Sequence, residues 1–370
     1  MSKATDEYRR ELDELTFSSE SKHRMANHIA EAGFIRANLT AMPARRRTSH
    51  LAKHPARIAL RAALVAAALV IAAGGTGAAM ASGVLPLPAD LLSDIFDGPA
   101  CDTEVINRIG RPINTSCTNN GVTVTADAII GDRNMYTIVY TLTFEDRSTL
   151  DRLPAPDANG HVGAFMDGTL YVDGERGAQG SSHIRDLDPT DNTLQYVEQM
   201  SVETSSLVGR TARAHLDSIK LMPTGTDEVV NLATGPWDLK FKFNFEDTSI
   251  DIPVPENVDF DGATVKIEEA TVSPVGISVR YNINRIAHVD GESGKMSDRA
   301  QASLDAISNL PLIVIFKDGR IENGTSRSGF FSVDRKDGTT DVHKTWPFTQ
   351  ICDTDEIASI QIGDTIIDMA

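Results

Sequence analysis

Between Arg61 and Pro86 the chain runs for 24 residues, Ala62 to Leu85, without a single charged side chain. As an α-helix, such a run would extend roughly 36 Å, enough for a hydrocarbon core of about 30 Å. Apolar runs of this length are typical of a membrane span rather than of a core helix. We therefore predict one transmembrane helix within residues 58–85 and a juxtamembrane linker over residues 86–98.

Two alternatives remain open for this run. The sequence Ala79-Met80-Ala81 resembles the small-residue cleavage pattern of a signal peptide, although about 60 residues precede the run, more than in an ordinary n-region. The other alternative is a helix of a soluble domain. We expect an uncleaved span.

The charges beside the run predict its orientation. Basic residues crowd its N-terminal side, whereas acidic residues follow it. The basic residues are Arg45, Arg46, Arg47, Lys53, Arg57 and Arg61, and the acidic ones are Asp90, Asp94 and Asp97. Because basic residues close to a span stay cytoplasmic, we expect a cytoplasmic N-terminus and extracellular C-terminal domains at the cell membrane.

The charge balance differs between the two sides of the span. Residues 1–61 hold 12 Lys and Arg against 7 Asp and Glu, a net charge of +5, whereas the rest, with 23 against 45, carries −22. Nucleic-acid affinity comes largely from Lys and Arg that neutralise phosphates, so the acidic exterior argues against a nucleic-acid partner. We expect the basic stretch 43–61 to contact anionic membrane lipid.

The cytoplasmic segment, residues 1–57, shows two short amphipathic patterns. Tyr8, Leu12 and Leu15 recur at helical spacing, and Met25 and Ile29 begin a second apolar face. Two helices of this size bury too little surface to be stable alone. We therefore predict that these five residues bind a cytoplasmic protein; a loosely ordered tail is the alternative.

Beyond Pro99 the pattern is that of β-strands. Val122–Thr125, Tyr136–Tyr140 and Ile277–Tyr281 are rich in β-branched and aromatic residues, and Trp237–Phe245 alternates apolar and polar side chains. The continuous apolar run Leu312–Phe316 suggests a strand buried on both faces. Residues 297–309 are the best candidate for a short helix.

An internal similarity suggests how this part is divided. Asn120 to Leu142 aligns without gaps to Asp261 to Ile283, with a turn at the same place near residues 131–134 and 273–276. The fold class predicted is mainly β: two immunoglobulin-like sandwiches, residues 99–250 and 251–370, that each open with the same hairpin. Chance similarity between two hairpins is the alternative.

All three cysteines, Cys101, Cys117 and Cys352, follow the predicted span. Cys101 and Cys117 would close a short loop, and we favour that disulfide, which a chain-entropy model values at about 3 kcal/mol. Pairing of Cys352 with either of the others stays open.

No combination of residues predicts catalysis, a cofactor or a metal. The histidines His161, His183, His215, His288 and His343 are dispersed and are interpreted as solvated or satisfied side chains. The acidic segments 188–192 and 259–262 lack the register of a twelve-residue calcium loop and are interpreted as turns in water. We expect a protein that is not an enzyme.

Taken together, several segments resemble a known family. They are Glu11–Glu20 before the span, then Asn120–Val124, Tyr136–Tyr140 and Gly235–Leu239. The chain resembles the membrane-anchored bacterial proteins of domain-of-unknown-function family 4179, with a second immunoglobulin-like module. The resemblance implies association with an extracytoplasmic-function sigma factor, as in a transmembrane anti-sigma factor. Residues 1–57 lack the His-x3-Cys-x2-Cys pattern of zinc-binding anti-sigma domains, and no ligand residues carry over.

These observations lead to one expected function and one alternative. We expect a single-pass regulator whose cytoplasmic helices bind a sigma factor while the β domains sense or bind something in the cell envelope. The alternative is a surface-anchored structural or ligand-binding protein with no role in transcription.

Overall fold

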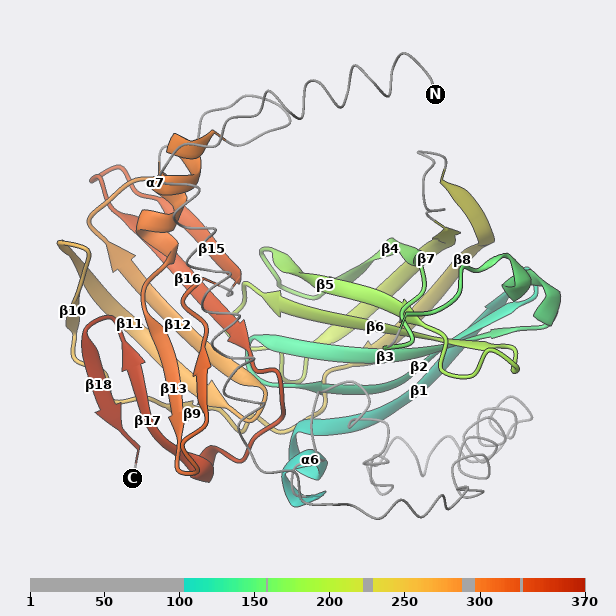
Figure 1. The fold of residues 1–370 in the computed structure, drawn as a ribbon, viewed down its shortest axis with the longest axis horizontal. Helices are drawn as coiled ribbons and strands as arrows, with labels where there is room; N and C mark the ends of the chain where they lie inside the picture. The colour runs from blue at the N-terminus through green and yellow to red at the C-terminus, as the bar shows by residue number, and fades with distance from the viewer. Residues whose placement is uncertain (1–102, 158, 222–228, 288–296, 327–328, 370) are drawn as a thin grey trace, which may run out of the picture. The chain divides into compact units, whose positions relative to one another are not determined.

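The computed structural model describes residues 103–157, 159–221, 229–287, 297–326 and 329–369, all within one compact unit of the chain, residues 66–370. The fold of these residues is mainly β, as predicted (Figure 1). Four antiparallel sheets form two modules with separate apolar cores. We call residues 110–245 module 1 and residues 250–368 module 2.

Module 1 packs a five-stranded sheet against a three-stranded one. The larger sheet has the order β1 (Gly110–Asn119), β2 (Val122–Gly131), β3 (Met135–Phe144), β6 (Thr193–Val202) and β5 (Ala178–Arg185). The smaller sheet has the order β4 (Ala164–Val172), β7 (Thr211–Leu221) and β8 (Val230–Lys242). Helix α6 (Thr103–Ile109) precedes β1, and the short 3₁₀ helix η1 (Arg147–Arg152) follows β3.

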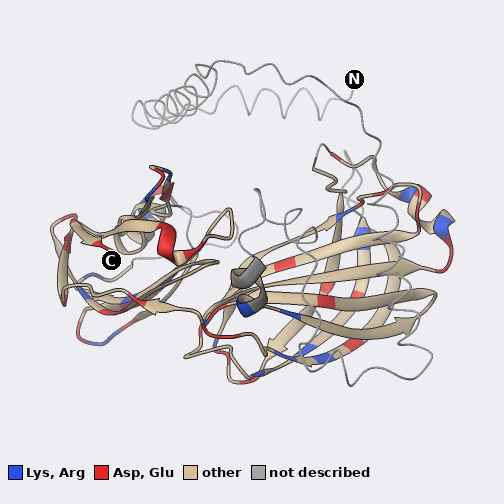
Figure 2. Ribbon diagram, turned by 90° about the horizontal axis from the view of Figure 1, so that it is seen from below, with Lys and Arg blue, Asp and Glu red and all other residues tan. Residues whose placement is uncertain are grey.

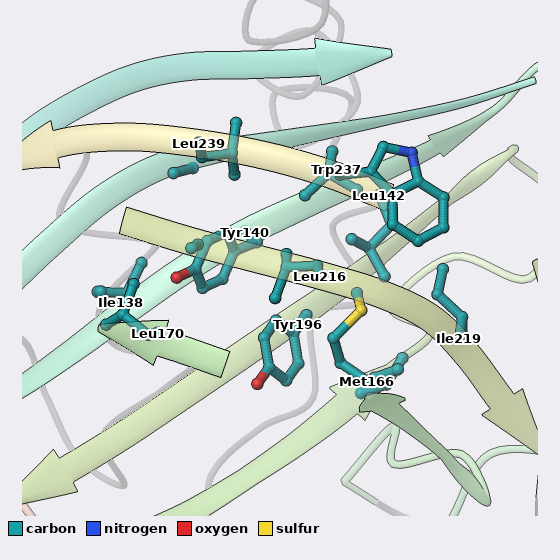
Figure 3. Close-up of a cluster of buried hydrophobic side chains, with 14 of the residues drawn as sticks. Ile138, Tyr140, Leu142, Met166, Leu170, Tyr196, Leu216, Ile219, Trp237 and Leu239 are labelled. Carbon is teal, nitrogen blue, oxygen red and sulfur yellow. The ribbon is translucent and has the colours of Figure 1, made fainter. Parts of the chain in front are cut away.

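The core of module 1 lies between these two sheets. Figure 3 shows side chains from both sheets meeting there, among them Tyr140, Tyr196, Leu216 and Trp237. The alternation predicted from Trp237 to Phe245 is confirmed, because its aromatic and aliphatic members are buried and Lys240 and Lys242 are exposed. It continues beyond the end of β8, where Phe243 and Phe245 still face the core.

Module 2 repeats the two-layer arrangement. One sheet has the order β10 (Asn257–Phe260), β11 (Ala263–Ser273), β12 (Gly276–Ile283), β16 (Thr340–Pro347) and β15 (Gly329–Asp334), with β9 (Ile250–Asp251) also paired to β11. The other has the order β14 (Ile321–Asn323), β13 (Leu312–Phe316), β17 (Ile357–Ile362) and β18 (Thr365–Asp368). The 3₁₀ helix η2 (Thr354–Glu356) precedes β17.

The predicted short helix is confirmed as α7 (Asp298–Ser308), which begins where the Ser297 hydroxyl accepts a hydrogen bond from the Ala300 amide. The prediction for Leu312–Phe316 is only half right. In β13 the side chains of Leu312, Val314 and Phe316 are buried, whereas Ile313 and Ile315 are half-buried. These two isoleucines lie on the face of the sheet that points away from the core of module 2.

The internal similarity corresponds to a repeated three-strand meander. Asn120-Gly121 joins β1 to β2 and Asp261-Gly262 joins β10 to β11, with positive φ at all four residues, as a type I′ turn requires. In both meanders the middle strand carries an irregularity at the same position of the alignment, at Asp127 in β2 and at Glu268 in β11. The equivalent hairpins β2–β3 and β11–β12 follow.

No helix among the described residues is long and apolar enough to cross a bilayer. The predicted span at residues 58–85 and the cytoplasmic segment 1–57 lie outside the described residues, and both stay predictions. Cys101 also lies outside them, so its disulfide with Cys117 stays a prediction. Cys117 packs against the core of module 1, and Cys352 is buried in the core of module 2.

Candidate functional site at the junction of the modules

The two repeated hairpins contact each other through their turns. Asp132 and Ser273 occupy equivalent positions in the repeat, and the Ser273 hydroxyl donates to the Asp132 carboxylate at 2.6 Å. The same carboxylate accepts hydrogen bonds from the amides of Asn134 and Met135 at 2.8 and 2.7 Å. Module 2 thereby supplies a donor to a buried carboxylate of module 1, which would lose one partner if the modules parted.

Apolar side chains surround this turn-to-turn contact. A small buried cluster joins Ile106, Ile109, Ala128, Ile130, Val275 and Ile351. Met135 packs so closely on module 2 that a Cβ added to Gly276 would lie 2.7 Å from its methyl carbon. That Cβ would lie nearer still, at 2.5 Å, to the Trp346 carbonyl oxygen, so pairing of β12 with β16 is what first requires glycine at position 276, whereas the flexible Met135 side chain could shift.

Arg133, in the same turn, bridges three carboxylates. Its guanidinium lies 3.1 Å from Asp247, which follows module 1, and 2.9 Å from Glu269 of β11. Asp251 of β9 lies 3.6 Å away. One cation thus holds acidic groups from both sides of the junction, which would otherwise repel one another.

A second polar contact centres on Glu203, directly after β6. Its carboxylate accepts from the Arg280 guanidinium at 2.6 Å and lies 2.5 Å from Nδ1 of His343. Arg280 also donates to the Thr204 carbonyl at 2.8 Å. Burial opposes ionisation of Glu203, but hydrogen bonds from His343 and Arg280 outweigh it and lower the pKa of Glu203 to about 2.

His343 links this carboxylate to a hydroxyl. Its Nε2 lies 2.8 Å from the hydroxyl oxygen of Ser278, on the neighbouring strand β12. Because a carboxylate only accepts, Nδ1 carries the proton and Nε2 accepts from Ser278. Burial lowers the pKa of His343, the bond to Glu203 raises it, and nearby Arg280 lowers it again, with a net lowering.

The order hydroxyl, imidazole, carboxylate matches that of hydrolytic triads. Here, however, Ser278 lies within a strand and is only 6% exposed, and the imidazole is covered from both modules. A substrate would have no room beside this hydroxyl while the modules are together. What the arrangement provides is a buried hydrogen-bonded link between two β modules.

A small cavity lies beside the junction. Its volume is about 10 Å³, and it is lined by Ile130, Met135, Tyr136, Thr137, Gln199, Val275 and Pro347. Small-molecule sites usually measure about 300–1,000 Å³. This cavity is too small for an ordinary organic ligand.

Inside module 1, the carboxyl group of Glu198 is buried. The Tyr136 and Tyr140 hydroxyls both donate to it at 3.3 Å. Burial raises the pKa of Glu198 to about 7, although the two tyrosine bonds lower it. The native state therefore holds this proton more tightly than the unfolded chain, and the stability gained is lost as pH rises from about 4.5 through 7.

We expect Glu198→Gln to remove part of this pH dependence. In the wild type, ionisation of this carboxyl lowers the free energy of unfolding by up to about 1.4 kcal/mol per pH unit over that range. A glutamine does not titrate and has no such effect. Thermal unfolding of the full chain at pH 5 to 8 in a Trp346→Phe background, where Trp237 is the remaining tryptophan, measures the difference by fluorescence. Glu145→Gln, at an exposed glutamate, is the control, and equal pH dependence in Glu198→Gln and wild type would contradict the assignment.

The other site predictions from the sequence concern metal binding, the acidic turns and the partner-binding helices. No group of three His, Cys, Asp or Glu side chains in the described part of the chain could hold a metal. Asp188 and Asp191 each cap a turn by accepting from the backbone and hydroxyl of Thr190 and Thr193. The predicted partner-binding residues Tyr8, Leu12, Leu15, Met25 and Ile29 lie outside the described residues.

Sequence reasoning missed the junction. Glu203 and His343 are 140 residues apart, and Asp132 and Ser273 are 141 apart. No spacing rule relates residues at such separations. The one available signal was the internal repeat, which places Asp132 and Ser273 in equivalent turns.

Charged residues are distributed over both modules. Figure 2 shows Lys and Arg interspersed with Asp and Glu along strands and loops. Several are paired across strands, such as Lys220 with Asp167 and Arg335 with Asp341. Exposed pairs of this kind contribute about 0–1 kcal/mol each and do not by themselves define a site.

Comparison with known proteins gives a distant structural match. No family model matches the chain, and no curated protein matches it. Among solved structures, the chain is similar to one described as the crystal structure of the conserved domain protein from Bacillus anthracis. The two share 15% sequence identity with a TM-score of 0.45, over 74% of this chain and 84% of that chain.

Proposed function

We propose that the chain is a single-pass membrane regulator that resembles an anti-sigma factor and is not an enzyme. Residues 1–57 bind an extracytoplasmic-function sigma factor in the cytoplasm, and residues 58–85 cross the membrane. The two β modules, which we assign to the immunoglobulin-like class, sense or bind a component of the envelope. The basic stretch 43–61 contacts anionic lipid.

The observation that carries this proposal is the charge-free run Ala62–Leu85 with arginines on one side only. It separates a small basic segment from a large acidic one, so the two meet different partners. The β modules support a sensing role because polar contacts, those of Glu203 and Asp132, contribute to their junction beside one small apolar cluster. Contacts of this kind are more easily broken than an extended apolar interface.

Substituting aspartate at the predicted helical face tests the cytoplasmic half of the proposal. We expect Leu12→Asp combined with Ile29→Asp to weaken binding by at least about 100-fold, because each ionised carboxylate would be buried against an apolar groove. Co-purification of the full chain with extracytoplasmic-function sigma factors of its own cell, each co-expressed with it, measures this loss. Asn27→Asp, on the opposite side of the second predicted helix from Ile29, is the matched control.

Two outcomes would contradict the proposal. Unchanged co-purification of the double variant would show that this face does not bind the sigma factor. No retention of the sigma factor by the wild-type chain would favour the surface-anchored structural or ligand-binding protein instead. That alternative further expects deletion of residues 1–40 to leave transcription unchanged.

A further inference from the structure

The link between Glu203, His343 and Ser278 joins one titratable imidazole to both modules. His343 is 3% exposed and lies on β16, on the face of its sheet opposite the module 2 core. Its ring stacks on Phe331 of β15, with centroids 5.9 Å apart. The Glu203 carboxylate reaches it from module 1.

Three charged groups lie around His343. Glu203 comes from the segment after β6, Arg280 from β12 and Glu269 from β11. Arg280 contacts Glu203 at 2.6 Å and Glu269 at 3.5 Å, while Arg133 contacts Glu269 at 2.9 Å. Each carboxylate near His343 thus already has an arginine partner. Glu203 and Glu269 favour a protonated imidazole and Arg280 opposes it, so burial of the ring decides the direction and favours the neutral form.

Protonation also disturbs the hydrogen bonds. In the closed junction Nε2 of His343 accepts from the Ser278 hydroxyl. An imidazolium has no acceptor, so the hydroxyl would have to turn away and accept instead. A buried cation that already neighbours Arg280 is costly unless it becomes solvated.

We propose that the two β modules form an acid-sensitive pair, in which protonation of His343 releases module 2 from the Glu203 segment of module 1. While the modules are in contact, which we call the closed pair, the imidazole of His343 is neutral. When the modules part, the imidazole is exposed to water and takes up a proton. This inference deepens the proposed sensing role and rests on it for its biological meaning. The stimulus is mild acidification on the extracellular side.

The direction of the pH effect follows from the surroundings of His343. Because burial and Arg280 hold its pKa below the ordinary 6.5, parting the modules takes up a proton. Stability of the closed pair is therefore present above about pH 6.5 and is lost as pH falls below it. Glu203, with a pKa of about 2, stays ionised throughout. One proton allows a change of at most about tenfold per pH unit.

Oxidation of methionine in the full chain, purified in detergent, tests the proposal. Met135 is buried at the junction against Gly276, whereas Met166 is buried inside the core of module 1. Thioether oxidation by hydrogen peroxide converts an accessible methionine to its sulfoxide, which mass spectrometry quantifies. We expect the Met135 oxidation rate to rise about fivefold or more from pH 7.5 to pH 5.0, with Met166 unchanged.

Substitutions test whether the proton that parts the modules binds to His343. His343→Gln keeps a neutral donor and acceptor, and we expect it to protect Met135 at both pH values. His161→Gln, at a half-buried histidine of module 1, is the control and should retain the wild-type response. Glu203→Gln removes the charge that pairs with Arg280, and we expect faster Met135 oxidation at both pH values.

Three results would overturn the proposal: equal Met135 oxidation at both pH values in the wild type, a retained acid response in His343→Gln, or parallel oxidation of Met166. His343→Gln could leave Met135 rapidly oxidised even at pH 7.5. The pH at which the wild-type Met135 oxidation rate is half-way through its rise then decides. A midpoint between pH 5 and 6.5 fits an imidazole, whereas one below pH 4 would indicate a carboxylate and refute the proposal. Because this experiment examines only the junction, its failure leaves the sigma-factor co-purification result unaffected.

Discussion

Trp237→Ala is expected to lower the free energy of unfolding of module 1 by about 4 kcal/mol. Trp237 is fully buried between the two sheets of module 1, next to Leu142 in Figure 3 and paired in register with Leu216. Its indole nitrogen also donates to the Val122 carbonyl at 3.0 Å. Alanine would remove the ring from a packed core and leave that carbonyl without its indole donor.

The chain's two tryptophans make this measurable. Trp346 lies in the core of module 2, so in Trp237→Ala its fluorescence follows module 2 alone while circular dichroism follows both modules. We expect an early circular-dichroism transition with the Trp346 transition retained. Trp237→Phe, which keeps most of the apolar volume and loses the indole hydrogen bond, should cost about 1–2 kcal/mol. Equal losses for alanine and phenylalanine would show that packing is not the cause.

Lys344→Met is expected to destabilise module 2 by about 3 kcal/mol. Strand alternation places Lys344 on the same core face as Val342 and Trp346, where it is fully buried. Its ammonium donates to three carbonyls: those of Ser308, Leu310 and Thr325, at 2.6, 3.0 and 2.6 Å. Methionine fits the space but leaves all three oxygens without this donor, and their desolvation outweighs the relief of removing a buried charge.

Unfolding in a Trp237→Phe background, where Trp346 is the remaining tryptophan, measures this effect by fluorescence. Lys266→Met, at an exposed lysine, is the matched control and should change stability by less than about 0.5 kcal/mol. The pH dependence offers a second readout. Burial lowers the pKa of Lys344 to about 7, so above that pH the unfolded chain holds the proton more tightly. Module 2 should gain stability from pH 7 to about 10, and Lys344→Met should lose that gain. A more stable Lys344→Met would contradict the role assigned to the three bonds.

Several features of the β modules could be predicted from the sequence because they depend on local pattern. Alternation from Trp237 to Phe245 identified a strand with one buried face, and Ser297 marked the start of α7. The prediction that Leu312–Phe316 is buried on both faces was wrong for one face, where Ile313 and Ile315 are only half-buried. Its apolar run gives no alternation, and periodicity alone does not show how much of a sheet's outer face is covered.

The internal repeat was predicted only in part. The sequence indicated equivalent hairpins, and the Asn120-Gly121 and Asp261-Gly262 turns explain why, since each supplies the positive φ that a tight hairpin needs. That the turns of these hairpins contact each other through Asp132 and Ser273 had no sequence signal. Equivalent positions in a repeat need not touch.

By itself the sequence determined several of the strands, the turns of the repeated hairpins and the charge-free run that precedes the β modules, because backbone conformation and strand alternation are set by near neighbours. Only the tertiary structure decided the fate of the buried polar groups. Lys344 meets carbonyls from three separate positions, and His343 meets a carboxylate 140 residues away. Such partners exist only once the sheets have packed, since packing removes water and obliges each buried polar group to bond to whatever lies beside it.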